Sequence, residues 1–207
     1  MQFRSIIAAL TVSLGVGQAY AETLTDDHIS YSYFNVGYQQ ISVDVDQISD
    51  SIDLDGMSVG GSVELDQPYF IFGSIAALRN DSFAAGFGVE AAFDVDQLET
   101  GIGFYRDLST NTDFVGTLSY IKQDAQLGSF FGQEDSGAAI SAGVRTKLSS
   151  QLEFGGAIQH AVIEGEGETG FNISADYFVQ PWLALQVSGG ISENARIYGF
   201  GIRLQHL

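Results

Sequence analysis

The histidines are the residues of this chain that come closest to hydrolytic chemistry. His160 lies two residues from both Ile158 and Val162, and in a strand residues two apart share a face. This parity predicts that the His160 imidazole points to the apolar side of a strand. His28 and His206 are expected near the two ends of the structured chain. A serine hydrolase brings a serine, a histidine and an acid together, and no nucleophile-elbow motif lies beside His160. The sequence therefore predicts no catalytic residue.

Closely spaced aspartates resemble fragments of calcium-binding loops. The patterns are Asp44-x-Asp46, Asp53-x-Asp55-Gly56 and Asp94-Val95-Asp96. The ligand spacing and the terminal bidentate glutamate of an EF-hand are missing from all of them. We therefore predict hydrated acidic loops with no metal site and no cofactor, and weak divalent-ion binding is the alternative.

Basic residues of the predicted strands gather toward one end of those strands. They are Arg106, Arg145, Lys147 and Arg203. Arg145 and Arg203 share the polar parity of their strands, so we expect both side chains to point inward. A buried cation requires a partner, and inward Glu153 or Glu99 would supply one.

The last segment, Arg196–Leu207, shows how such side chains are positioned. Tyr198 and Phe200 alternate with Gly199 and Gly201, a period of two that is typical of a strand. An edge strand this apolar would invite aggregation. We therefore predict that it pairs antiparallel with the strand near 29–40, which closes the sheet into a barrel.

The same period recurs along the whole chain and predicts about ten strands, with eight as the alternative. The expected strands are 28–40, 54–65, 69–78, 95–106, 113–123, 136–147, 152–163, 170–179, 183–191 and 196–207. Tight turns are expected at 66–68, 107–112, 148–151 and 180–182. The other five connections are mostly longer and acidic: 42–53, 124–135 and 164–168 as loops, 79–94 as a longer connection interpreted as a hairpin that continues beyond the bilayer, and 192–195 as a short turn. Strand 69–78 is apolar on both parities, so its faces cannot be assigned from the pattern.

The N-terminal segment, the cysteine content and the net charge limit the possible class of protein. Residues 1–21 predict a secretory signal peptide: Arg4, an apolar run and Ala19-Tyr20-Ala21, which leaves 22–207 as one barrel domain. The chain has no cysteine, so it has no disulfide framework. Its formal net charge of -18 excludes nucleic acid as a partner, because phosphate binding requires clustered Lys and Arg.

The polarity of the strand faces favours a membrane barrel over a soluble sandwich. One face is apolar and almost free of charge, and the other is rich in glycine, serine and glutamine. Aromatic residues gather beside the short turns, which predicts an interfacial girdle. They are Tyr69, Phe70, Phe104, Tyr105, Phe114, Phe154, Tyr177 and Trp182.

These features together resemble the small outer-membrane barrels of Gram-negative bacteria, the OmpX and OmpA-barrel type. The resemblance is carried by the signal peptide, the opening Tyr31-x-Tyr33-x-x-x-Gly37-Tyr38, the ending Gly199-Phe200-Gly201 and the turn rhythm. It implies an outer-membrane location, lipid and lipopolysaccharide as surroundings, and the barrel-assembly machinery as a partner. The chain departs from this type in its strand number and in Leu207, where an aromatic residue is usual; Phe200 and His206 are partial substitutes.

A barrel of ten strands is close to the size whose interior is filled by side chains. The leading prediction is a non-enzymatic outer-membrane barrel with acidic extracellular loops and a structural or surface-interaction role, for which the sequence names no ligand. The alternative is a narrow channel for small solutes or cations, favoured by the glycine-rich inner face. A lipid-modifying enzyme that uses His160 ranks third.

Overall fold

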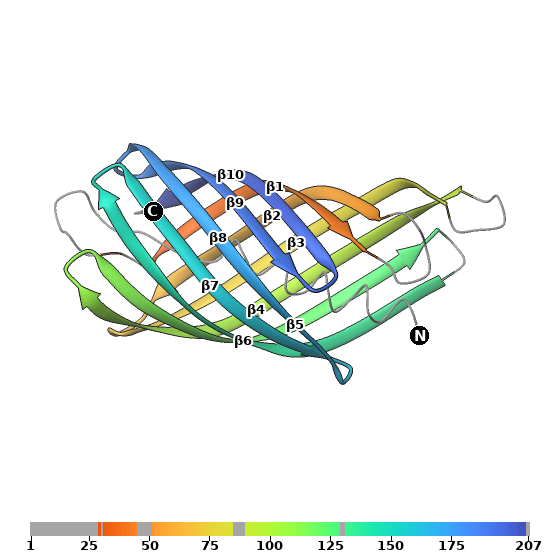
Figure 1. The fold of residues 1–207 in the computed structure, drawn as a ribbon, viewed down its shortest axis with the longest axis horizontal. Coiled ribbons are helices and arrows are strands. Elements are labelled where there is room, and N and C mark those ends of the chain that lie inside the picture. Colours follow the sequence, from red (N-terminus) through yellow and green to blue (C-terminus); the bar gives the residue numbers. More distant parts are fainter. Residues whose placement is uncertain (1–28, 30, 45–50, 85–89, 129–130, 206–207) are drawn as a thin grey trace.

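The computed structural model describes residues 29, 31–44, 51–84, 90–128 and 131–205. These residues form one closed antiparallel barrel of ten strands (Figure 1). The predicted signal peptide at 1–21 lies outside the described residues, as do His28, His206 and Leu207. In the described part of the chain no helix is long and apolar enough to cross a membrane, a finding that does not bear on spans made by strands.

The strands follow one another around the barrel in chain order. They are β1 (Tyr33–Val43), β2 (Ile52–Glu64), β3 (Tyr69–Ala84), β4 (Glu90–Ser109), β5 (Thr112–Leu127), β6 (Phe131–Ser149), β7 (Leu152–Ile163), β8 (Glu166–Gln180), β9 (Leu183–Ser192) and β10 (Ala195–Gln205). The prediction of ten strands is confirmed, and the eight-strand alternative is wrong.

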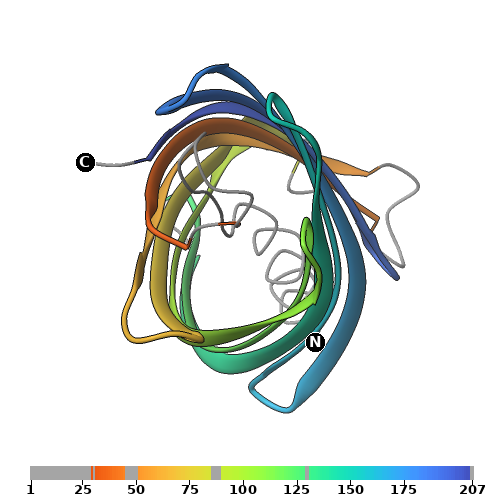
Figure 2. The same cartoon turned by 90° about the vertical axis from the view of Figure 1, so that its left-hand side faces the viewer.

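The closing strand β10 pairs antiparallel with β1, as predicted. The register runs from Tyr33 opposite Gln205 to Val43 opposite Ala195. The start of β1 and the end of β10 therefore lie at the same end of the barrel, beside the short turns. We assign this end to the periplasm, because outer-membrane barrels have short periplasmic turns and longer outer connections. Seen along its axis, the wall closes into a ring (Figure 2).

Alternation of side chains gives the wall an apolar outside. On β10, Tyr198 and Phe200 are exposed on the outer face, while Arg203 is buried inside. The structure also assigns the faces of β3: Ile71 and Ile75 point outward, and Phe70 faces the lumen. The apolar and nearly uncharged side chains of the outer face therefore form a belt that suits the hydrocarbon of a bilayer.

Much of the chain in the connections predicted at 79–94 and 124–135 belongs to strands. β3 and β4 extend beyond the belt, so the connection at 79–94 is a hairpin that projects at the outer end, with a second from β5 and β6 (Figure 1). The polar loop predicted at 124–135 is wrong, because Asp124 pairs opposite Glu134 in that second hairpin. Polarity predicted a loop here, but hydrated strands that leave the bilayer are polar too.

The connections predicted at 42–53 and 164–168 are also shorter than expected. Val43 and Ile52 belong to β1 and β2 and face the lumen, although the sequence suggested a loop over 42–53. The acidic segment 164–168 narrows to a two-residue turn with φ of 49° at Glu164 and 88° at Gly165. Positive φ at both central residues matches the twist of a hairpin, and glycine accepts it without strain.

The aromatic girdle is confirmed in part. Tyr69, Phe104, Phe154, Tyr177 and Trp182 are exposed on the outer face near the periplasmic end. The prediction is wrong for Phe70 and Tyr105, which are buried in the lumen. Each stands next in sequence to an outward aromatic residue, so clustering along the chain could not separate the two faces.

Candidate functional site in the lumen

The lumen is lined by three levels of different chemistry. The floor, at the periplasmic end, consists of Tyr31, Asp113, Arg145, Glu153, Asp176 and Arg203. Small and amide side chains line the middle level. The upper lumen is one apolar cluster: Ile41, Val43, Ile52, Leu54, Ala76, Leu78, Phe93, Val95, Ile121, Ala125, Ala139, Ala161, Ile163, Ala195 and Ile197.

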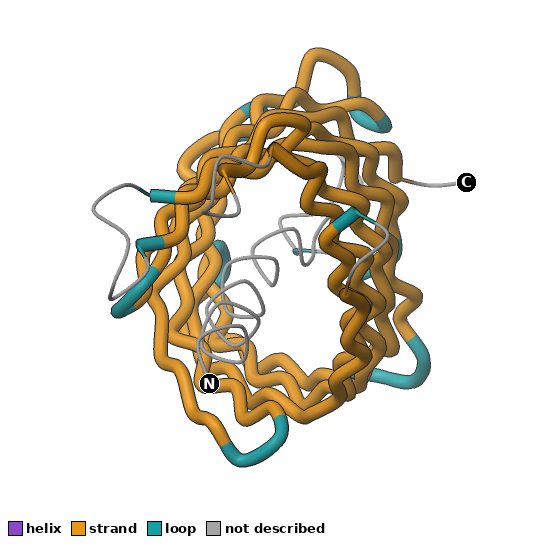
Figure 3. The backbone as a smooth tube through the Cα atoms, turned by 90° about the vertical axis from the view of Figure 1, so that its right-hand side faces the viewer, coloured by secondary structure: helices purple, strands orange, loops and turns teal. Residues whose placement is uncertain are grey.

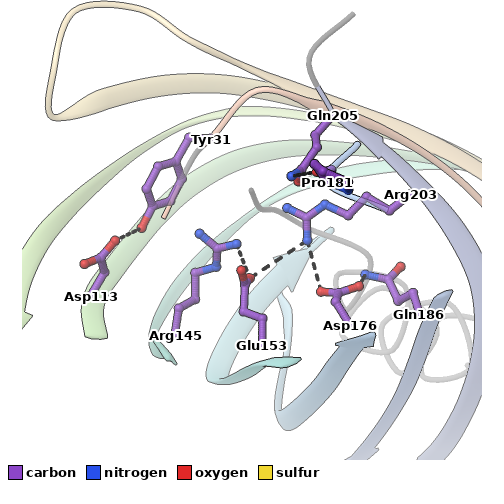
Figure 4. A network of polar contacts seen from close by, with 9 residues as sticks. All are labelled: Tyr31, Asp113, Arg145, Glu153, Asp176, Pro181, Gln186, Arg203 and Gln205. Atoms are coloured by element: carbon purple, nitrogen blue, oxygen red, sulfur yellow. Dashed lines mark hydrogen bonds and ion pairs between the residues drawn. The ribbon is translucent and has the colours of Figure 1, made fainter. Parts of the chain in front are cut away.

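Ion pairs connect one half of the floor (Figure 4). Arg145 donates to Glu153, and the Arg203 Nη1 lies 3.0 Å from Asp176 Oδ2 and 4.0 Å from Glu153 Oε1. Gln186 Nε2 donates to the other oxygen of Asp176 at 3.0 Å. The four charged side chains are at most 2% exposed. This network therefore connects β6, β7, β8, β9 and β10 across the inside of the barrel.

Aromatic residues complete the floor on its other side. The Tyr31 hydroxyl donates to Asp113 Oδ2 at 2.8 Å, and its ring stacks on Tyr105 with 4.0 Å between centroids. The guanidinium carbon of Arg145 lies 5.0 Å from the centroid of the Tyr31 ring. A cation over an aromatic face is attracted to the ring quadrupole. Tyr31 thus joins β4 and β5 to the ion pairs.

Register explains why these groups meet. Arg145 lies opposite Asp113, and Glu153 lies opposite Asp176, so the two arginines and three acids of neighbouring strands come to similar heights, with Glu153 and Asp176 between Arg145 and Arg203. The predicted inward pairing of Arg145 and Arg203 is confirmed with Glu153. Glu99 is buried on β4 further from the periplasmic end, opposite Ile121. The sequence could not choose between the two acids because parity fixes the face but not the height.

The middle level carries the polar inner face that the sequence predicted. Gln39 Nε2 donates to Ser58 Oγ at 2.9 Å, and Gln123 Nε2 donates to Gln97 Oε1 at 2.6 Å. Inward glycine, serine and alanine occupy much of the remaining wall at this height. These side chains are smaller than the arginine and tyrosine side chains of the floor.

Sequence reasoning missed the upper lumen. Ile41 continues the inward parity of Gln39, and Leu54 continues that of Ser58, so both lie inside the barrel. Some residues of the cluster, such as Val43 and Ile52, lay in a stretch predicted as a loop, whereas others, such as Leu54 and Ile197, lay in predicted strands on the face taken as polar. An apolar inner lining is unusual, because the interior of outer-membrane barrels is polar.

The outer end of the barrel is acidic, and its basic residues are paired. Arg79 Nε lies 2.5 Å from Asp94 Oδ1, Lys122 Nζ lies 3.0 Å from Glu134 Oε1, and Arg196 Nη2 lies 3.7 Å from Asp44 Oδ2. Among the described residues of this end, acids that form no ion pair outnumber these cations. They include Asp53, Asp55, Asp96, Asp124, Asp135, Glu164, Glu166 and Glu168.

Four of the aspartates that resembled calcium loops lie on strands: Asp53 and Asp55 on β2, and Asp94 and Asp96 on β4. Asp53 and Asp55 belong to β2, where their carboxylates accept hydrogen bonds from Ser42 at 2.5 Å and Tyr38 at 2.6 Å. Asp46 lies outside the described residues. Within the described part of the chain no group of three or more His, Cys, Asp or Glu side chains is placed to hold a metal ion.

The outward direction predicted for His160 is confirmed. Its Nδ1 lies 2.8 Å from the Thr169 hydroxyl, on the exposed outer face of β7 and β8. The neighbouring outward residues of β7 are Ile158 and Val162, which are exposed and apolar. The structure therefore places this histidine beside a hydroxyl on the lipid-facing side of the wall.

Comparison with known proteins bears on the fold alone. No family model and no curated protein matches the sequence. Among solved structures, the β domain of the Bordetella autotransporter BrkA is similar with a TM-score of 0.52 and 9% identity, over 85% of this chain and 99% of that one. The chain folds as a Gram-negative outer-membrane β-barrel. Its apolar belt and this fold place it in the outer membrane.

Two further solved structures are similar at low identity. The translocator domain of the autotransporter NalP from Neisseria meningitidis has a TM-score of 0.51 and 13% identity, over 100% of this chain and 95% of that one. Ail, the attachment invasion locus protein of Yersinia pestis, has a TM-score of 0.46 and 15% identity, over 84% and 97%.

Proposed function

We propose that this protein is a non-enzymatic, non-conducting outer-membrane barrel that acts through contacts at its outer, acidic end. The observation that carries this proposal is the floor. Buried charged and aromatic side chains meet there across the lumen, and they are held by ion pairs, hydrogen bonds and aromatic stacking. Figure 4 shows the polar contacts of this floor.

The chemistry of the floor opposes conduction. A solute would have to separate Arg203 from Asp176 and move the Tyr31 ring from Tyr105. Breaking a buried ion pair costs several kcal/mol, about 3–5 by typical measurements, because it leaves uncompensated charge in a medium of low polarity. Such a barrier makes spontaneous opening rare.

A narrow cation channel is the second candidate, and the middle level favours it. The side chains of the middle level are smaller than those of the floor. The acidic outer end would raise the local concentration of cations. In this function the floor would act as a gate. The two candidates therefore differ in whether the floor of the unmodified protein is open.

Recordings in planar bilayers test the proposal. We expect no discrete steps from the correctly folded wild type, and steps from a variant that combines Tyr31→Ala with Arg203→Ser. Lys122→Ser is the matched control, because it removes an outward, exposed cation and should stay silent. Heat-dependent gel migration verifies folding of each protein. Discrete steps from the folded wild type would refute the closed barrel and support the channel.

Lipid, lipopolysaccharide and the barrel-assembly machinery are the partners that we propose. The apolar belt supports contact with lipid acyl chains, and paired basic residues at its outer edge, such as Arg79 and Lys122, lie where anionic lipid head groups would meet the wall. Depletion of the assembly machinery should remove the protein from the outer-membrane fraction. Undiminished insertion after depletion would contradict this partner.

A further inference from the structure

We infer that the outer wall carries a specific site for a phospholipid of the periplasmic leaflet, with an acyl chain in a groove across β1 to β4 and the phosphate at Arg106. This inference goes beyond the proposed function and does not depend on whether the floor is closed. It starts from a groove of about 690 Å³ in the wall, a volume typical of sites for small ligands. Its lining includes Phe34, Val63, Ile71 and Ile102, which are exposed on the outer face.

Two adjacent glycines form the bottom of this groove. Gly61 on β2 and Gly73 on β3 lie opposite each other, and Phe34 and Thr100 continue the same row on β1 and β4. This row is about 14 Å long, because neighbouring strands lie roughly 4.8 Å apart. A Cβ atom at Gly73 would meet its nearest neighbour, the Glu99 carbonyl oxygen, at 3.5 Å, which is an ordinary contact. The space above Gly73 is therefore open.

Larger outward side chains border the glycines on both sides. They are, toward the periplasm, Val63, Ile71 and Ile102, and, toward the outer end, Val59, Ile75 and Leu98. The groove is therefore long across the strands and one residue row wide, a shape that suits an extended hydrocarbon chain better than the rounded wall of a second barrel. The Thr100 hydroxyl donates to the Phe72 carbonyl at 3.3 Å, so its hydrogen bond stays within the wall.

Another outward glycine shows how exposed backbone is covered elsewhere in the wall. Gly116 on β5 lies under the Phe104 ring, with which a Cβ atom at this position would overlap. At Gly61 and Gly73 the atoms nearest to such a Cβ are backbone oxygens, not a covering ring. Glycine inside a strand often marks a place where a ligand approaches the backbone closely. An acyl chain would supply here the cover that Phe104 supplies to Gly116.

The surroundings of the groove identify lipid as its occupant. The wall is closed around the barrel (Figure 3), so a groove on its outer face opens to the bilayer. Gly61 precedes Leu65 by four residues and Gly73 follows Tyr69 by four, whereas a strand needs about 9–11 residues to span the bilayer. The groove therefore lies in the periplasmic half of the apolar belt, where chains of the periplasmic leaflet meet it.

A cation lies on the same face at the level of the head groups. Arg106 on β4 continues the outward row of Ile102 and Phe104 and is exposed, whereas Arg145 and Arg203 are buried in the lumen. Arg106 forms no ion pair with another described residue. A guanidinium binds phosphate oxygens through charge-assisted hydrogen bonds. Four residues, about 13 Å along the strand, separate Arg106 from Ile102 at the edge of the groove, so one lipid can reach both.

A spin-labelled phospholipid tests the site in nanodiscs. The protein is folded into phosphatidylcholine nanodiscs with labelled isoleucine methyls, and phosphatidylglycerol with a nitroxide on one acyl chain is added at increasing mole fraction. We expect the Ile71 and Ile102 methyls to broaden first and to saturate. Ile158 on β7 and Ile173 on β8 are also exposed on the outer face, and their methyls should broaden weakly and in proportion to the label.

Filling the groove tests the position of the acyl chain. Gly73→Val should reduce the broadening of Ile71 and Ile102 to the level of Ile158. Gly156→Val is the matched control, because Gly156 is an outward glycine of β7 at which a Cβ atom meets nothing closer than 3.8 Å. This control should leave the broadening of Ile71 and Ile102 unchanged. Heat-dependent gel migration verifies folding of each variant.

Arg106→Ser tests the position of the phosphate. It should weaken binding of the labelled phosphatidylglycerol by about fivefold, the contribution of one basic residue near a lipid surface. Diacylglycerol with the same labelled chain has no phosphate, so its weaker binding should not change in this variant. Lys122→Ser is the control, because it removes an exposed cation that is paired with Glu134 at the outer end.

Several results would overturn the inference. Equal broadening of all outward methyls, or undiminished broadening in Gly73→Val, would show contact with bulk lipid. Competition by lipid A as strong as that by unlabelled phosphatidylglycerol would assign the groove to lipopolysaccharide, and a dimer in detergent that Gly73→Val dissociates would assign it to a second copy. A conducting wild type would refute the closed floor but would leave the methyl broadening unchanged, so the two proposals fail separately.

Discussion

Arg203→Ala is expected to destabilise the barrel strongly. The Arg203 side chain is fully buried and interacts with three groups: Asp176 at 3.0 Å, Glu153 at 4.0 Å and the Tyr33 ring, whose centroid lies 4.6 Å from the guanidinium carbon. Removing the guanidinium leaves Glu153 with Arg145. Among the described residues, Asp176 then has the neutral amide of Gln186 as its hydrogen-bond donor.

The expected loss of stability follows from the Asp176 carboxylate, which stays buried without its cation. Leaving a buried carboxylate without its cation costs about 3–5 kcal/mol. Loss of the cation–π contact with Tyr33 adds roughly 0.5–2 kcal/mol. Relaxation of the floor and entry of water offset part of this loss. We therefore expect the free energy of unfolding to fall by about 3–5 kcal/mol.

Denaturant unfolding in lipid vesicles measures this change. Trp182 is the only tryptophan of the sequence, and it is half-exposed in the aromatic girdle, so its fluorescence reports transfer from the interface to water. Heat-dependent gel migration provides an independent signal. Arg79→Ala is the matched control, because its exposed pair with Asp94 should contribute little.

A paired substitution distinguishes lost charge compensation from lost packing. Combining Arg203→Met with Asp176→Leu removes both charges and keeps apolar volume, so it should recover most of the stability that Arg203→Ala loses. If Arg203→Ala unfolds at the wild-type midpoint, the floor does not hold the barrel together. If the paired variant is as unstable as the single one, the stability comes from packing and not from charge.

Two further predictions concern single positions. Gly103→Val should lower the free energy of unfolding by about 1–3 kcal/mol, because a side chain there meets the ring of Phe70, whereas Gly132→Val, which meets nothing within 4 Å, should be neutral in the same unfolding assay. His160→Ala should leave outer-membrane lipid composition unchanged in lipid extracts; loss of a lipid turnover activity would contradict the non-enzymatic barrel.

Much of the fold could be predicted because period-two alternation is a property of the chain itself. The inward direction of Arg145 and Arg203 followed from this alternation alone, and the pairing of β10 with β1 followed from the need to cover an apolar edge strand. Parity fails where both faces carry the same kind of residue. On β3, Phe70 and Ile71 are both apolar, and only the barrel shows that the first is inside.

Height along the barrel is the second property that the sequence does not specify. The meeting of Arg203 with Asp176 depends on the register of β8, β9 and β10, which is set by turns and cross-strand contacts. A shift of two residues would keep every parity and move these charges apart. The candidate floor was therefore predictable as a set of inward charges, and its contacts were not.

The two ends of the lumen stabilise the barrel by different means. Buried charges at the floor connect strands through ion pairs that depend on the height of single residues. The upper lumen is a packed apolar core, in which Ile41, Leu54 and Ile197 are at most 1% exposed. A polar side chain at Ile41 or Leu54 would leave the backbone hydrogen bonds of the wall intact but would lose this apolar burial, so the upper level contributes through packing where the floor contributes through charge pairing.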